Sequence, residues 1–74
     1  MTGDGVPKDK KKAVELLQAS AGKGNATAMY NLGTSYMKGD GVSKDKKKAT
    51  ELYKRAADLG QKEAKKTLQR MKVK

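Results

Sequence analysis

The chain has 74 residues and contains no cysteine, histidine, phenylalanine or tryptophan, while 18 basic residues against 8 acidic ones give it a formal net charge of +10. The lack of cysteine and histidine excludes internal disulfides and removes the side chains that most often bind zinc or act as a general base. So short a chain has room for one domain with a thin core, because it buries only about 60% of the surface that its unfolded form exposes. No stretch approaches the ~20 apolar residues of a membrane span and no signal peptide is recognisable, so a cytoplasmic location is the default expectation.

The first predicted helix covers residues 9–22. Asp9 stands where an N-cap residue belongs, with a side chain that accepts hydrogen bonds from first-turn N–H groups. Apolar residues then recur at spacings of three and four, which predicts one apolar helix face. That face consists of Ala13, Leu16, Leu17 and Ala21. Gly24 is the predicted stop, because glycine readily adopts the left-handed conformation that ends helices.

The second predicted helix covers residues 26–38. Its apolar face is broader and consists of Ala28, Met29, Leu32, Tyr36 and Met37. Gly33 lies inside this helix at a cost of about 1 kcal/mol relative to alanine, so we expect a neighbouring helix to approach closely there. The Gly-Asp-Gly sequence at 39–41 then predicts a turn that reverses the chain.

The third predicted helix covers residues 45–59, with Asp45 as its N-cap and Gly60 as its stop. Its apolar face consists of Ala49, Leu52, Tyr53, Ala56 and Ala57. The fourth predicted helix covers 62–72 and keeps only a narrow apolar stripe, made of Ala64, Leu68 and Met71. Its residues 65, 66, 69 and 72 are Lys, Lys, Gln and Lys, which is typical of the polar helix that caps a repeat array.

Two copies of one unit make up the chain. Residues 3–38 laid over residues 39–74, an offset of 36, give 17 identities without a gap. This period belongs to helix-pair repeats. We therefore predict an all-α fold over residues 1–74, an α-α superhelix of about two repeats and four helices, with 3–38 as a partial first repeat and 39–74 as a second repeat that ends in the capping helix.

The repeated residues resemble a known family. The run Ala28-x3-Leu32-Gly33-x2-Tyr36-x2-Gly39-x-Gly41-Val42 continues as Asp45-x2-Lys48-Ala49-x3-Tyr53-x2-Ala56-Ala57-x2-Gly60 and is similar to the Sel-one-like repeat, a relative of the tetratricopeptide repeat. The resemblance implies a right-handed superhelix with a concave binding surface and a function as an adaptor that assembles protein complexes. On this basis we expect a protein partner on the concave face, with candidate contacts from Tyr30, Asn31, Thr34 and Tyr53.

The N-terminal side of the repeat array is predicted to be open. The first repeat lacks its first helix, so nothing covers one side of the 9–22 helix, where Ala13 and Leu17 lie. Three explanations remain: an excised C-terminal fragment, self-association through this face, or docking on a larger assembly. Loss of a dimer in sedimentation of Leu17→Lys would support self-association.

Three groups of basic residues are candidate anion-binding positions. They are Lys10, Lys11 and Lys12; Lys46, Lys47 and Lys48; and Lys65, Lys66 and Arg70. Cations in a first helical turn oppose the helix dipole, so the two triplets indicate either selection for anion binding or a duplicated solvated patch. They support an alternative function as a small basic accessory protein bound to RNA or to another anionic assembly. Few arginines and no cluster of aromatic residues argue against sequence-specific nucleic-acid binding.

Catalysis is not expected. Six of the eight carboxylates recur in both repeats, and a residue repeated in every unit is usually structural. Asp4 and Asp40 lie in turns, whereas Glu15 and Glu51 suit ion pairs along a helix. We predict no enzyme activity, no cofactor and no metal site.

Overall fold

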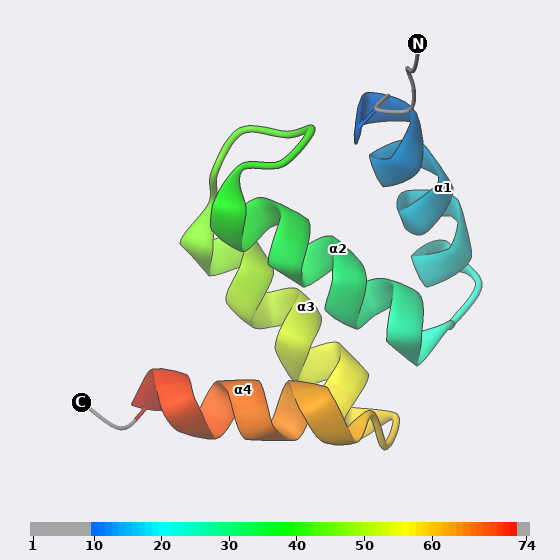
Figure 1. The fold of residues 1–74 in the computed structure, drawn as a ribbon. Helices are drawn as coiled ribbons and strands as arrows, with labels where there is room; N and C mark the ends of the chain where they lie inside the picture. Colours follow the sequence, from blue (N-terminus) through cyan, green and yellow to red (C-terminus); the bar gives the residue numbers. More distant parts are fainter. Residues whose placement is uncertain (1–9, 73–74) are drawn as a thin grey trace, which may run out of the picture.

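A computed structural model describes residues 10–72, of which Lys72 is described in its backbone alone. Four helices follow one another: α1 (Lys10–Gly22), α2 (Ala26–Lys38), α3 (Lys46–Asp58) and α4 (Lys62–Lys72) (Figure 1). The described residues contain no strand, and the prediction of an all-α fold with four helices is confirmed. None of these helices combines the length and apolarity needed to cross a bilayer.

Side chains just before the helices satisfy their first backbone N–H groups. The Asp45 carboxylate accepts a hydrogen bond from the Lys48 N–H at 3.0 Å, which confirms the predicted N-cap of α3. Asn25 caps α2 in the same way through the Ala28 N–H, also at 3.0 Å, a role that we had not predicted. The predicted N-cap Asp9 lies outside the described residues.

The four helices pack in sequence order, each against its neighbours along the chain. α2 packs against α1 on one side and α3 on the other, and α3 also packs against α4. The result is an elongated array that measures 42 × 29 × 18 Å (Figure 1). Its core consists of small and medium side chains, drawn mostly from α2 and α3: Val14, Ala28, Met29, Leu32, Ala49, Tyr53, Ala56 and Ala64.

Helices α2 and α3 approach each other closely at Gly33. A Cβ atom at this position would lie 2.9 Å from Cε1 of Tyr53 and 3.2 Å from the carbonyl oxygen of Ala49. These distances are too short for any larger residue without movement of the buried tyrosine. The predicted close approach of a neighbouring helix at Gly33 is confirmed.

One part of the predicted helix faces is wrong. The apolar face predicted for α1 includes Leu16, but Leu16 is 67% exposed, and Val14, which lies outside that predicted face, is the buried residue of this helix. The two residues are about 200° apart around the helix, since each residue turns it by about 100°. α1 has α2 as its packed neighbour among the described helices, and the side turned toward α2 is the side of Val14.

Candidate interaction surfaces

A polar groove of about 240 Å³ runs between α2 and α4, and we call it the α2–α4 groove. Tyr30 lines it from α2, and the facing residues of α4 are Glu63, Lys66, Thr67 and Arg70. Because the two cations outnumber the single carboxylate, the groove favours an anionic or polar partner group beside the tyrosine.

The buried Tyr53 ring packs against the ring of Tyr30, and Thr34 connects the two tyrosines through hydrogen bonds. The rings of Tyr30 and Tyr53 are tilted by 40°, with centroids 5.5 Å apart, a distance typical of favourable aromatic pairs. The Thr34 hydroxyl donates to the Tyr30 carbonyl at 3.2 Å and lies 3.0 Å from the Tyr53 hydroxyl. Since the Thr34 proton goes to the carbonyl, the Tyr53 hydroxyl is the donor to Thr34. Tyr30 is therefore a preorganised aromatic side chain at a groove edge.

The four residues expected on the concave face differ in their exposure to solvent. Tyr30 and Thr34 are half-buried, and Asn31 is exposed, so these three have surface to offer. Tyr53 is only 3% exposed and its hydroxyl is already bonded to Thr34. It therefore belongs to the core, where it supports Tyr30, and it has almost no surface to offer a partner.

The open side of α1 is best understood by comparison with α3. Ala13 is exposed and Leu17 is half-buried. Their equivalents one repeat later, Ala49 and Tyr53, are 0% and 3% exposed. In α3 this face is covered by α2, as the close approach at Gly33 shows. The described residues contain no helix that covers α1 in the same way.

Comparison with protein families gives the repeat its identity. Two consecutive matches to the Sel1 repeat cover residues 1–25 and 26–61. The chain belongs to the Sel1 repeat family. The resemblance noted in the sequence is thus confirmed, and the family is one of non-catalytic helical scaffolds for protein interaction. The comparison with curated proteins found no match, and the comparison with solved structures found none either.

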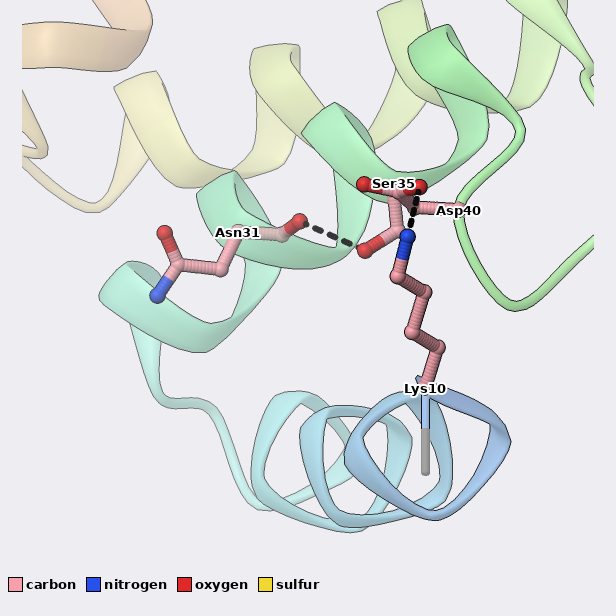
Figure 2. A network of polar contacts seen from close by, with 4 residues as sticks. All are labelled: Lys10, Asn31, Ser35 and Asp40. Carbon is pink, nitrogen blue, oxygen red and sulfur yellow. Dashed lines mark hydrogen bonds and ion pairs between the residues drawn. The ribbon is translucent and has the colours of Figure 1, made fainter. Parts of the chain in front are cut away.

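The lysine triplets of the two Sel1 repeats have different surroundings. Lys10 reaches from α1 to Asp40, in the loop after α2, with 3.1 Å between Nζ and Oδ1 (Figure 2). Lys48 lies over the Tyr36 ring, 5.4 Å from its centroid. Lys46 and Lys47 line a shallow surface on the outside of α3. Lys10 is thus ion-paired, whereas its equivalent Lys46 lies on an open surface, so the two triplets do not form one uniform anion site.

Polar contacts near Lys10 involve α2 as well. Figure 2 shows the Ser35 hydroxyl donating to the Asn31 carbonyl at 3.3 Å, close to the Lys10–Asp40 pair. The Asn31 side-chain amide makes no hydrogen bond to any described residue, and so its donors and acceptor remain available to a partner.

The basic residues of α4 divide between two sides of the helix. Lys65, Lys66 and Arg70 are all exposed. Lys66 and Arg70 line the α2–α4 groove, whereas Lys65 does not. Two of the three predicted anion positions on α4, Lys66 and Arg70, thus lie at one surface with Tyr30, a juxtaposition that the sequence did not reveal.

A second groove, which we had not predicted, lies between α1 and α3 over α2, and we call it the α1–α3 groove. It holds about 290 Å³. Gln18 lines it from α1, Leu32 and Tyr36 from α2, and α3 contributes Lys48, Glu51, Leu52 and Arg55. The spacing of Lys48, Leu52 and Arg55 along one helix face was visible in the sequence. Recognising the groove also required the positions of α1 and α2.

Among residues 10–72, no three or more acidic side chains come close enough together to hold a metal ion.

Proposed function

We propose that this Sel1 repeat protein is an adaptor in a larger assembly and that it binds a protein partner through the α2–α4 groove. The braced Tyr30 ring at the edge of this groove is the observation that carries the proposal. Tyrosine is enriched among the residues that dominate binding energy, because it offers a large rigid contact area with a polar tip. Its ring already packs against the buried Tyr53 ring, so binding loses less side-chain entropy there.

The charges around Tyr30 suggest the chemistry of the partner. Lys66 and Arg70 stand on the opposite wall, and Asn31 is exposed on α2 with an unused amide. A partner segment with a carboxylate for the cations and a hydrogen-bonding group for the amide would satisfy all of these residues.

Site-specific photo-crosslinking tests the surface. A photoreactive amino acid at Asn31 should crosslink a defined protein, whereas the same amino acid at the exposed Lys54 on α3 should not. With that protein purified, Tyr30→Ala should weaken binding by roughly tenfold or more in calorimetry, as for other aromatic hot spots. Tyr30→Phe should retain most of the affinity, because the ring contact with Tyr53 remains. Equal crosslinking at both positions would contradict the proposal.

The alternative, a basic accessory protein on RNA, draws on the same cations. Binding through counterion release alone would fall steeply with salt. Affinity for unrelated RNA that persists at about 300 mM salt would favour the RNA-bound function, since non-specific binding is weak under those conditions. Loss of RNA binding at this salt concentration, with retention of binding to the protein partner, would favour the adaptor function.

The open face of α1 is proposed as a second contact, for a helix that packs as α2 packs on α3. That helix belongs either to a longer form of the chain, to a second copy, or to another subunit of an assembly. Sedimentation analysis distinguishes the second copy. A dimer that is lost in Leu17→Lys would establish self-association, and an unchanged monomer would exclude it.

A further inference from the structure

The α1–α3 groove is separate from the proposed adaptor surface. Its floor residue Leu32 and the adaptor residue Tyr30 are two positions apart on α2, about 200° around the helix. The two grooves share no lining residue. A ligand in one therefore leaves the other open.

The groove combines an apolar floor with cationic walls. Leu32 is buried and Leu52 half-buried at its base. Lys48 and Arg55 rise from α3 on either side of Leu52, one turn apart from it. The Arg55 guanidinium forms no ion pair or hydrogen bond with any described residue, so all its donors are available. Glu51 is the single carboxylate of the lining.

The size of the groove indicates what it accepts. Pockets for drug-sized ligands hold about 300–1,000 Å³ and bury most of the ligand. At about 290 Å³ the α1–α3 groove lies at the lower limit of this range, and because it is open along one side it would leave part of such a molecule exposed. It suits one apolar side chain of an extended segment that continues past it.

The surroundings of Tyr36 favour a peptide over a nucleic acid. Binding of single-stranded nucleic acid relies on aromatic faces on which bases stack. In this groove the Lys48 ammonium already lies over the Tyr36 ring, and Gln18 Nε2 donates to the Tyr36 hydroxyl at 3.4 Å. The leucine floor also matches an aliphatic side chain better than a ribose or phosphate.

We propose that the α1–α3 groove binds an acidic peptide segment, with an aliphatic side chain on Leu32 and Leu52 and carboxylates on Arg55 and Lys48. Planar guanidinium binds carboxylate in a bidentate manner, so Arg55 fixes the position of the peptide. The net charge of +10 steers acidic segments toward the chain. This site adds a second partner surface to the proposed adaptor function and does not depend on it.

The probe is a short fluorescein-labelled peptide in which each leucine is flanked by pairs of glutamates. Titration of the isotopically labelled protein should shift the backbone amide signals of Gln18, Leu52 and Arg55. Signals of Tyr30 and Lys66 should remain in place. No saturable binding, or shifts confined to the α2–α4 groove, would overturn the proposal. So would a single-stranded RNA that binds at Gln18 and Arg55 more tightly than the peptide.

Two neighbouring charge reversals on α3 separate the groove from general electrostatics. Arg55→Glu and Lys54→Glu change the net charge equally and affect exposed side chains, but only Arg55 lines the groove. Fluorescence anisotropy should show binding weakened about tenfold or more in Arg55→Glu and less than about twofold in Lys54→Glu. A peptide with alanine in place of leucine should also bind about tenfold more weakly, because the apolar contact is lost. Equal losses in both variants, or no effect of the leucines, would mean that charge alone holds the peptide.

Discussion

Helices α1 and α3 both begin with Lys-Lys-Lys-Ala, yet the repeat positions that follow have very different surroundings. In α3, Ala49, Tyr53 and Ala56 are 0%, 3% and 0% exposed because α2 and α4 pack on the helix. In α1, the equivalent Ala13 is exposed and Leu17 is half-buried. A repeat sequence thus specifies which helix face is apolar. Whether the side chains on that face are buried depends on the presence of a neighbouring helix that covers it.

The same substitution at the two alanines should separate the helices most strongly. Ala49→Gln places a larger polar side chain in a fully buried site, which should destabilise the protein by at least about 3 kcal/mol through overpacking and an unsatisfied amide. Ala13→Gln should change the free energy of unfolding by less than about 0.5 kcal/mol, as expected at an exposed position. Thermal unfolding followed by circular dichroism measures both. A large loss in Ala13→Gln would show that α1 is covered in the same way as α3.

Much of this packing followed from the sequence. Spacing of apolar residues gave the four helices, and the recurring Asp and Gly positions gave the N-cap at Asp45 and the stops at Gly24 and Gly60, both of which have positive φ. The close helix contact at Gly33 was predictable because glycine inside a helix is less stable than alanine by about 1 kcal/mol, and a tight contact accounts for its presence. These features depend on local chemistry and on one neighbouring helix.

Features that depend on how each helix is rotated about its axis relative to its neighbours could not be predicted from the sequence. The sequence of α1 permits either Val14 or Leu16 to be buried, and the choice depends on which side meets α2. The same holds for the two grooves. Lys66 and Arg70 face Tyr30, and Arg55 faces Gln18, only because of how successive helices cross. The Asn25 cap does not belong with these features, because asparagine directly before a helix is a local N-cap signal that the sequence contains. Its equivalent Gln61 caps α4 through a longer side chain, whose oxygen lies 2.9 and 3.1 Å from two backbone nitrogens.

Substitution of two glycines, Gly33 in α2 and Gly22 in α1, compares the helix contacts of the two regions. Gly33→Ala introduces a Cβ into the Tyr53 ring, and its overpacking cost of about 1–3 kcal/mol should exceed the gain of about 1 kcal/mol in helix propensity. At Gly22, at the end of α1, a Cβ would meet nothing within 4 Å. Gly22→Ala should therefore stabilise the protein by up to about 1 kcal/mol. Chemical denaturation measures the change in the free energy of unfolding for each substitution. Stabilisation by both substitutions would show that α2 and α3 are not tightly packed.

Removal of the side-chain caps should have an intermediate effect. Asp45→Ala and Asn25→Ala each delete one hydrogen bond to the first turn of a helix, and each should lower the free energy of unfolding by about 1 kcal/mol. Asp45→Asn retains the accepting oxygen and should lose much less. Urea unfolding of the three variants checks this. Equal losses in Asp45→Ala and Asp45→Asn would assign the effect to the charge of Asp45 instead of its cap.

The contact between α1 and the loop after α2 should contribute least. Lys10 and Asp40 remain 66% and 49% exposed in their side chains, and exposed ion pairs are worth about 0–1 kcal/mol. Asp40→Asn should therefore lower stability by less than about 0.5 kcal/mol at low salt, with no difference at high salt. A larger, salt-independent loss would indicate that Asp40 has a structural function in the turn.

Amide hydrogen exchange resolved by residue tests the central claim most directly, because it measures α1 and α3 in the same molecule. If coverage by neighbours determines the stability of each repeat helix, the amides of 50–57 should exchange at least about tenfold more slowly than those of 14–21. Adding a partner that covers the Ala13–Leu17 face should slow exchange in α1 toward the rate in α3. Equal protection of the two helices in the isolated protein would contradict the account.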